Sequence, residues 1–262
     1  MSLRISFKSG IKKILPQSLR HWIFRCGMAL DGESCPGFVF RNYPEFSWLD
    51  HSLQALKKLG FNPGMIVDVG AYEGQWTLMI REIYPKAQVL MVEPQERKKE
   101  ILEKIVRKFS PSVSFISTLL GSVDRKEVVF YLSETGSSVL PEIHSPAVAS
   151  LSLQSRTLSS VLREKGLPPP DFIKLDVQGY ELEILGGCDD LLKTATLVLL
   201  EVAIQPCNQG APSFNEVLRY MDEKNFIPFD FGTFFRSGKE SRLCQVDLIF
   251  VRKDSNLHGG SS

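Results

Sequence analysis

One stretch decides the fold of this chain: Met65-Ile-Val-Asp-Val-Gly-Ala-Tyr-Glu-Gly-Gln-Trp76. An apolar run that ends near Asp68 is followed by a turn with two glycines and then by an amphipathic run at 76–80. This order predicts a buried strand, a tight turn and the start of a helix. A second apolar run, 88–92, ends at Glu93. Two such strands joined through a helix predict a parallel βαβ unit.

The same alternation continues along the chain. We expect further strands at 113–118, 171–177 and 196–202, and helices at 47–59, 74–83, 95–108, 157–165 and 213–224. The last two strands, near 226–231 and 246–251, follow each other without a helix, which predicts a hairpin and one antiparallel strand. Segments 126–132 and 149–155 resemble edge strands that pair with each other, with a loop between them. The pattern is that of an α/β fold with a mostly parallel sheet.

Size and composition restrict the function. With 262 residues the chain can form one large α/β domain, alone or with an appendage. A net charge of +1 gives no reason to expect a nucleic-acid partner. No apolar run reaches the roughly 18 residues that cross a bilayer. Five scattered cysteines without a CxxC pair predict reduced thiols in a cytoplasmic protein, and no metal site.

The N-terminal segment, residues 1–46, differs from the rest in charge. Six Lys or Arg residues precede the first acid, Asp31, and apolar residues recur there at helical spacing. This pattern predicts a basic amphipathic helix that contacts a membrane peripherally, an organelle transit sequence, or a helix docked on the main domain. We expect the main domain at 47–254 and a disordered Gly- and Ser-rich tail at 255–262.

Acidic residues fall at or near the ends of four apolar strands: Asp68, Glu93, Asp176 and Glu201. In open parallel sheets, ligands bind at this edge. Lys174 interrupts its strand two residues before Asp176, so both side chains point to the same face. The lysine therefore forms either a structural ion pair or part of an acceptor site.

The glycine turn favours a single nucleoside over a dinucleotide. A pyrophosphate cradle usually has the pattern G-x-G-x-x-G, whereas these two glycines are four residues apart, and Glu73 would repel a pyrophosphate. The methionine moiety of S-adenosylmethionine fits better, because its ammonium group can meet Asp68 or Glu73. Its carboxylate can meet the N–H groups of the turn, and Glu93 can accept hydrogen bonds from the ribose.

Over residues 64–205 the chain resembles the FkbM-type family of S-adenosylmethionine-dependent methyltransferases. The similarity rests on residues 67–74, 92–94 and 156–158, and most specifically on Phe172-Ile-Lys-Leu-Asp-Val-Gln-Gly-Tyr-Glu-Leu-Glu-Ile-Leu-Gly-Gly187. The resemblance implies a Rossmann-like, mostly parallel sheet of seven strands, one of them antiparallel, with helices on both faces. This is the class I methyltransferase type. The resemblance also implies O-methylation of a small-molecule or carbohydrate acceptor.

The resemblance also implies site residues. Asp68, Gly70 and Glu93 match cofactor contacts, and Lys174, Asp176 and Glu181 match motif positions near the reacting centre. Together with the glycine turn, this predicts a cofactor-binding set of Asp68, Gly70, Tyr72, Glu73, Gly74, Glu93 and Glu181. Two positions depart from the family pattern: Gln178 replaces a usual glutamate, and Tyr72 replaces a usual asparagine.

Methylation of a hydroxyl group needs a proton acceptor. Our leading candidate is Asp176, with Lys174 orienting it. His144, in the predicted loop 133–145, is the second candidate. We expect the walls of the acceptor pocket to come from the variable segments 135–144, 205–212 and 231–236.

Two other functions stay open. One is a nicotinamide-dependent oxidoreductase on a related sheet, against which the missing third glycine and Glu73 argue. The other is a non-catalytic, membrane-peripheral binding protein, which Gln178 leaves open. The sequence does not distinguish oxygen from nitrogen as the methylated atom, and it leaves the acceptor and the oligomeric state undetermined.

Overall fold

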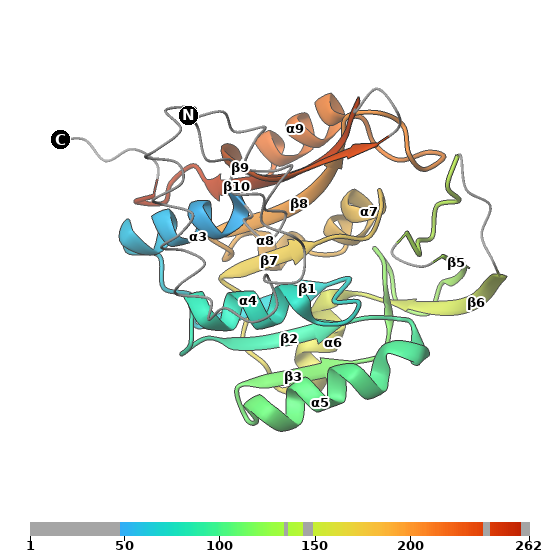
Figure 1. Cartoon of the computed structure of the whole chain (residues 1–262), viewed down its shortest axis with the longest axis horizontal. Coiled ribbons are helices and arrows are strands. Elements are labelled where there is room, and N and C mark those ends of the chain that lie inside the picture. Colours follow the sequence, from blue (N-terminus) through green and yellow to red (C-terminus); the bar gives the residue numbers. More distant parts are fainter. Residues whose placement is uncertain (1–47, 134–135, 144–148, 238–241, 258–262) are drawn as a thin grey trace, which may run out of the picture. The chain divides into compact units, whose positions relative to one another are not determined.

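The computed structural model describes residues 48–133, 136–143, 149–237 and 242–257. A seven-stranded sheet forms the centre of this part (Figure 1). Its strands lie in the order β3 (Val113–Ile116), β2 (Gln88–Val92), β1 (Met65–Val69), β7 (Phe172–Leu175), β8 (Leu197–Ala203), β10 (Arg242–Arg252) and β9 (Phe226–Ser237). The strands from β3 to β8 are parallel, and β10 is antiparallel to both of its neighbours. The predicted sheet with one antiparallel strand is confirmed within these residues.

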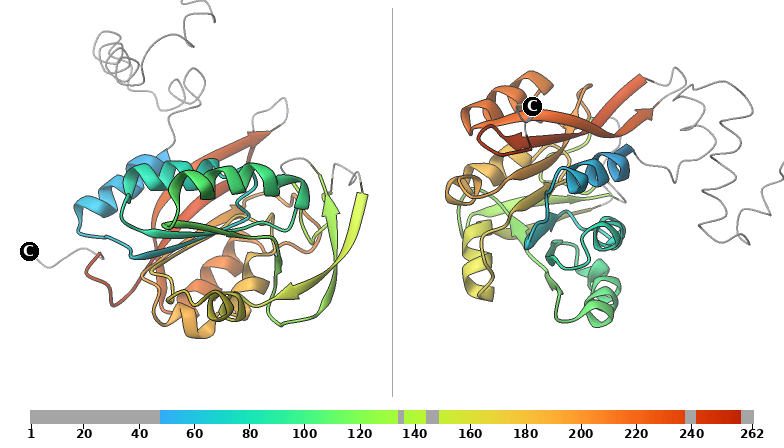
Figure 2. Two further views of the ribbon diagram at one scale, coloured as in Figure 1. Left: turned by 90° about the horizontal axis from the view of Figure 1, so that it is seen from below. Right: turned by 90° about the vertical axis from the view of Figure 1, so that its left-hand side faces the viewer.

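Helices cover both faces of the sheet (Figure 2). On one face lie α3 (Trp48–Lys58), α4 (Gln75–Ile83) and α5 (Lys99–Phe109), the last preceded by the 3-10 turn η2 (Glu96–Lys98). On the other face lie α6 (Leu158–Lys165), α7 (Glu181–Gly186), α8 (Asp189–Leu192) and α9 (Phe214–Glu223).

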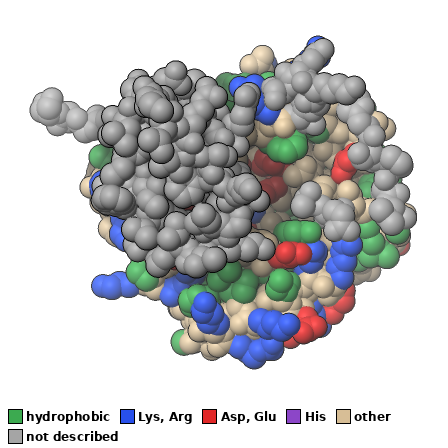
Figure 3. Space-filling model, in the orientation of Figure 1, with side chains coloured by type: hydrophobic (Ala, Val, Ile, Leu, Met, Phe, Trp, Pro, Cys, Tyr) green, Lys and Arg blue, Asp and Glu red, His purple; other side chains and the backbone are tan. Residues whose placement is uncertain are grey.

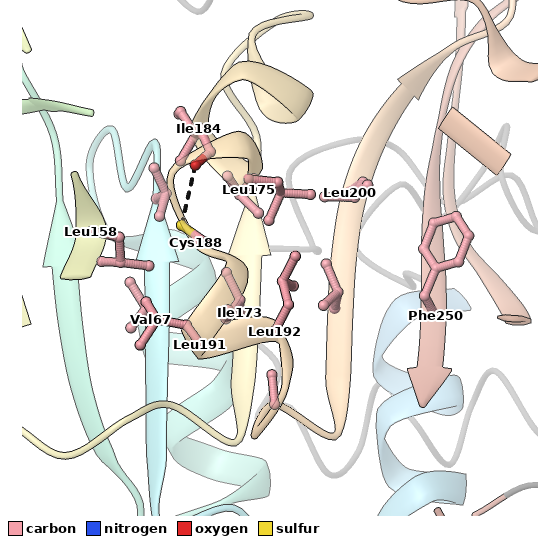
Figure 4. Packing of buried hydrophobic residues seen from close by; sticks show 14 of the residues in the cluster. Val67, Leu158, Ile173, Leu175, Ile184, Cys188, Leu191, Leu192, Leu200 and Phe250 are labelled. Carbon is pink, nitrogen blue, oxygen red and sulfur yellow. Dashed lines mark hydrogen bonds between the residues drawn. The ribbon is translucent and has the colours of Figure 1, made fainter. Parts of the chain in front are cut away.

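The apolar strands are explained by burial on both faces. Successive side chains of a strand point to opposite faces, so in β1 Ile66 packs with the first helix group and Val67 with the second. Figure 4 shows Val67 and Ile173 of the sheet close to Leu158 and Leu191 of the second group. Strands buried on both sides have continuous apolar runs instead of an alternating pattern.

The predicted helix ends agree with local chemistry. Ser213 caps α9, and its hydroxyl and Glu216 exchange hydrogen bonds in a capping box. Gly166 ends α6 in the left-handed conformation, with φ of 64°. The short helices α7 and α8 were not predicted, because segments of four to six residues carry little periodicity.

Two expectations need correction. The segments near 126–132 and 149–155 do pair, as β5 (Glu127–Leu132) and β6 (Ala149–Arg156), but they form a separate sheet with β4 (Leu119–Leu120). β4 follows β3 closely in the chain and pairs with the end of β6, which holds this small sheet beside the main one. The main domain also continues beyond residue 254, because Leu257 is buried in the core.

The N-terminal segment is not described. Residues 1–47 lie outside the described part, so the domain boundary that we placed between residues 46 and 47 stays a prediction. The predicted amphipathic helix and its membrane contact therefore stay predictions. Among the described helices, none is both long and apolar enough to span a membrane.

Candidate active site

A cavity of about 800 Å³ lies at the carboxyl ends of the parallel strands. Its wall contains residues from the turns after β1, β2 and β7, and from β8, β9 and β10. Since β2 and β7 lie on opposite sides of β1, this edge is the switch point of the sheet, where ligands of α/β proteins bind. Acidic side chains are visible in a hollow of this face in Figure 3.

Gly70 begins the turn after β1 and lines the cavity. Its φ is 73°, and a Cβ at this position would lie 1.9 Å from the carbonyl oxygen of Asp176. Its N–H donates to the carbonyl of Val92 at 3.0 Å. The turn therefore packs directly against the strand ends on both sides, which only glycine permits.

Glu93 and Tyr72 line the cavity beside this turn. The carboxylate of Glu93 is only 3% exposed and accepts hydrogen bonds from the N–H groups of Tyr72 at 2.9 Å and Gln95 at 3.0 Å. Burial raises the pKa of Glu93, and these two bonds oppose the rise. Each carboxylate oxygen keeps acceptor capacity for one more donor, so the residue fits the hydroxyl groups of a ribose.

Glu73 and Gly74 do not belong to the described cavity lining. Glu73 forms a 2.7 Å ion pair with Lys98, whose hydrogen bond lowers the pKa of Glu73. Gly74 has a φ of 79°, and a Cβ there would lie 2.3 Å from Ile105 of α5. Both residues stabilise the packing of the loop, and their predicted contact with a cofactor stays a prediction.

Asp68 is fully buried below the turn and does not reach the cavity wall. Its Oδ2 accepts a hydrogen bond from the hydroxyl of Thr77 at 2.7 Å, and its Oδ1 lies 3.0 Å from Nζ of Lys174. Asp68 therefore forms an internal ion pair with Lys174, and its predicted contact with a cofactor stays a prediction.

Lys174 connects the two ends of the cavity. Its Nζ donates to the carbonyl of Gly70 at 3.1 Å and lies 3.6 Å from Oδ2 of Asp176. Burial alone would lower the pKa of Lys174, but the charges of Asp68 and Asp176 outweigh it and raise the pKa. Lys174 forms a buried ion pair and also lines the cavity, so the two interpretations, a structural ion pair and a part of the site, are compatible.

Glu181 serves the turn after β7. Its Oε1 accepts hydrogen bonds from the N–H groups of Val177 at 3.0 Å and Gly179 at 3.1 Å. Burial raises its pKa to about 7. Glu181 is absent from the described cavity lining; it accepts hydrogen bonds from the turn, and its predicted cofactor contact stays a prediction.

The far end of the cavity holds Asp176 and Glu201, each at a strand end, and two glutamines. Oε2 of Glu201 accepts hydrogen bonds from the amide nitrogens of Gln178 at 2.6 Å and Gln245 at 2.8 Å. The same nitrogen of Gln178 lies 3.3 Å from Oδ1 of Asp176. Burial raises the pKa of Glu201 well above its usual range, and the charges of Asp176 and other nearby acids add to this.

Asp247 and Gln245 are site residues that sequence reasoning missed. Asp247 lies opposite Glu201 across the β8–β10 pair, and its Oδ2 accepts a hydrogen bond from the N–H of Thr233 at 3.2 Å. Burial raises its pKa to about 6, and the charge of Asp176 contributes. The sequence signal that could have found Asp247 is a charged residue inside an otherwise apolar strand. Lys174 was singled out because it also interrupts such a strand.

Parts of the three predicted acceptor segments line the cavity: Gly136, Ser137, Ser138, Val139, Glu142, Cys207, Asn208, Thr233 and Phe235. His144 lies outside the described residues, so its role stays a prediction. The described cysteines are free thiols. No group of three or more His, Cys, Asp or Glu residues in the described ranges is arranged to hold a metal ion.

Solved structures with distant similarity include two methyltransferases. Methyltransferase FkbM from Methylobacillus flagellatus KT is 13% identical with a TM-score of 0.46, over 71% of this chain and 43% of that one. The 1,6-didemethyltoxoflavin-N1-methyltransferase from Burkholderia thailandensis is 12% identical with a TM-score of 0.44, over 92% of each chain.

Among curated proteins, methyltransferase sdnD from Sordaria araneosa is 27% identical over 167 residues, which cover 52% of this chain and 64% of the relative. The AMB antimetabolite synthetase AmbE from Pseudomonas aeruginosa is 28% identical over 175 residues, which cover 52% of this chain and 8% of the relative. The chain thus matches less than two-thirds of the length of either relative.

A family model described as the methyltransferase FkbM domain matches residues 68–228, more than half of the chain. The match includes the turn after β1, Glu93, and the complete turn after β7. The cofactor that this family implies is S-adenosylmethionine, which agrees with the acceptor capacity of Glu93. The chain therefore belongs to the FkbM family of methyltransferases.

Proposed function

We propose that this protein transfers a methyl group from S-adenosylmethionine to a hydroxyl oxygen of a small-molecule or carbohydrate acceptor. The observation that carries the proposal is one continuous cavity, lined by Gly70 and Glu93 after β1 and β2 and by Asp176 and Glu201 at the ends of β7 and β8. When bound, the cofactor would supply an electrophilic methyl group on its sulfonium. The protein then has to place an acceptor oxygen in line with that group and remove its proton.

At the donor end, Glu93 would accept hydrogen bonds from the ribose hydroxyl groups, and the turn at 69–72 would help to hold the cofactor. Lys174 is a positioning residue, because its ammonium group holds the carbonyls of residues 69 and 70 at 3.3 and 3.1 Å. Asp68 in turn fixes Lys174. This arrangement is preorganised, since its polar groups already have partners within the protein.

At the acceptor end, Asp176 takes the proton from the acceptor hydroxyl. Its side chain is 40% exposed, so an acceptor in the cavity can reach it. Lys174 and Gln178 contact its two oxygens and hold its orientation. A positioned base typically contributes roughly 10²–10⁴-fold to the rate. His144 stays the second candidate for this role.

The test begins with calorimetric binding of S-adenosylhomocysteine to the full-length protein. Incorporation of labelled methyl groups from S-adenosylmethionine is then screened over a panel of sugars and hydroxylated metabolites. Asp176→Asn should lower incorporation by roughly 10²-fold or more, with product binding changed no more than about twofold. Glu127→Gln, on β5 outside the cavity lining, is the matched control and should leave both unchanged.

Each possible failure has its own meaning. Absence of S-adenosylhomocysteine binding would remove the cofactor from the proposal. A product methylated on nitrogen would remove the oxygen acceptor and keep the cofactor. The family match to methyltransferases argues against the alternative of a nicotinamide-dependent oxidoreductase. Membrane contact through residues 1–30 is a separate proposal, tested by liposome co-sedimentation of the full chain and of a chain without them.

A further inference from the structure

We infer that the acceptor carries a positively charged amino group near the hydroxyl that is methylated. This inference rests on the proposed function, because it concerns the acceptor end of the same cavity. Three carboxylates from the main sheet and its turns line that end, Asp176, Glu201 and Asp247, and Glu142 of the acceptor segment also lines the cavity. Lys174 is the one cationic side chain among the described residues of the lining.

The positive charge of Lys174 already interacts with two carboxylates, Asp68 and Asp176. Its Nζ lies 3.0 Å from the fully buried Asp68 and 3.6 Å from Asp176. Glu201 and Asp247 form no ion pair with any Lys or Arg in the described part of the chain. Their hydrogen-bond donors there include the Gln178 and Gln245 amides and, for Asp247, both the backbone N–H and the side chain of Thr233, all of which are neutral. Neutral donors compensate a partly buried carboxylate less than a cation does.

Glu201 and Asp247 both line the cavity. Both amide bonds to Glu201 end on Oε2, and Glu201 also interacts with the carboxyl group of Asp176. Asp247 accepts from the backbone N–H of Thr233 on Oδ2 and also interacts with the Thr233 side chain. An ammonium group has three N–H donors around one charge, so it can donate hydrogen bonds to two or three carboxylates at once.

The raised pKa values of Asp247 and Glu201 agree with a site that lacks a neutralising positive charge. Burial and neighbouring acids raise the pKa of Asp247 to about 6 and that of Glu201 well above its usual range. Like-charged carboxylates at one site either keep a proton or gather a cation. Phe235 also lines this cavity and is 53% exposed, so its ring can contact a bound cation.

The cofactor does not account for this cluster. Its sulfonium and ammonium groups are positive, but Gly70 and Glu93, which would hold it, lie after β1 and β2. Neighbouring strands lie roughly 4.8 Å apart, so β8 and β10, two and three strands beyond β1, are about 10 and 14 Å away. Glu201 and Asp247 therefore lie on the acceptor side.

The experiment uses the full-length protein saturated with S-adenosylhomocysteine. Calorimetry at neutral pH compares D-glucosamine, D-glucose and N-acetyl-D-glucosamine, which share a ring and place an ammonium, a hydroxyl or a neutral amide at the same carbon. Glucosamine should bind roughly tenfold or more tightly than the other two. Its binding should be accompanied by proton release from the partly protonated acids.

Two variants locate the effect. Glu201→Gln and Asp247→Asn should each reduce the preference for glucosamine to about threefold or less while S-adenosylhomocysteine still binds. Should one of them fail to fold, the other provides the measurement. Glu127→Gln again serves as the control, and its preference should match that of the wild type.

The outcomes separate the two proposals. If S-adenosylhomocysteine does not bind, the proposed function fails. If it binds and the three sugars bind equally, or none binds measurably, the function stands and this inference is overturned. The inference is also overturned if both variants keep the preference for glucosamine, or if chelation of divalent metal ions abolishes that preference. A third contrary result is that the variants lose only a preference for S-adenosylmethionine over S-adenosylhomocysteine.

Discussion

The acidic residues at the two ends of the cavity have different kinds of partners. At the donor end, Asp68 is paired with Lys174 and Thr77, and Glu93 accepts two backbone N–H groups. At the acceptor end, Glu201 and Asp247 have neutral donors and raised pKa values. At the donor end the carboxylates are thus held by donors within the protein, and Glu93 keeps acceptor capacity for hydroxyl groups. At the acceptor end, Glu201 and Asp247 have no cation paired with them among the described residues.

The largest expected effect is the loss of the ion pair below the donor end. Lys174→Met should lower the free energy of unfolding by roughly 3–5 kcal/mol, because it leaves the fully buried Asp68 without its cation. Urea denaturation measures this loss. Adding Asp68→Asn to the same variant should recover part of it. A loss below about 1 kcal/mol would mean that the donor end does not depend on this pair.

The second effect tests the close contact between the turns after β1 and β7. Gly70→Ala should lower the free energy of unfolding by about 3 kcal/mol and abolish S-adenosylhomocysteine binding, because the Cβ would meet the backbone of Asp176. Gly166→Ala is the matched control, since its φ is also positive but no atom lies within 4 Å. That control should lose about 1 kcal/mol and bind normally, as thermal unfolding and calorimetry can show.

A third effect separates two neighbouring acids of the donor end. Glu93→Gln should weaken S-adenosylhomocysteine binding roughly tenfold, because hydrogen bonds to a charged acceptor are lost at the ribose. Glu73→Gln should change it no more than about twofold, because Glu73 pairs with Lys98 away from the cavity. Calorimetry of both variants provides the measurement, and equal losses would contradict this division of roles.

The smallest expected effect is a pH dependence at the acceptor end. The pKa of Asp247 is raised from 3.8 to about 6 in the folded protein, which therefore binds this proton more tightly than the unfolded chain does. Its contribution to stability is largest below about pH 4 and is lost as the pH rises to about 6. Asp176, Lys174 and Glu201 face this carboxyl group, so their charges set the size of the effect.

Asp247→Asn removes this dependence. The difference in free energy of unfolding between wild type and variant should fall by about 1 kcal/mol between pH 4 and 7, after allowance for partial solvent exposure. Urea denaturation at four pH values in this range provides the data. A difference that does not vary with pH would show that Asp247 titrates as in the unfolded chain.

Much of the donor end could be predicted from sequence. The apolar runs, the glycine turn and the strand-end acids identify neighbouring parallel strands, whose carboxyl ends must meet at one edge. The structure indeed brings Gly70, Glu93 and Asp176 to one cavity. Sequence could not distinguish acids that face the ligand from acids that hold the loop, as with Glu73. That choice depends on where α5 and Lys98 lie.

The acceptor end was less accessible to such reasoning. Asp247 lies in the middle of β10, and it reaches the cavity because β10 runs antiparallel to β8 and pairs it with Glu201. Gln178 departs from the family pattern, and its amide group joins Asp176 to Glu201. Neither contact follows from spacing along the chain.

The sequence alone therefore determined the order of strands and helices, the buried sheet and the edge at which the site forms. These properties depend on local patterns of apolar residues, turns and chain direction, which the sequence contains directly. Only the tertiary structure decided which carboxylates are neutralised inside the protein and which remain for a ligand. Neutralisation depends on distances of a few ångströms between residues that lie far apart in the chain, such as the 3.0 Å between Asp68 and Lys174.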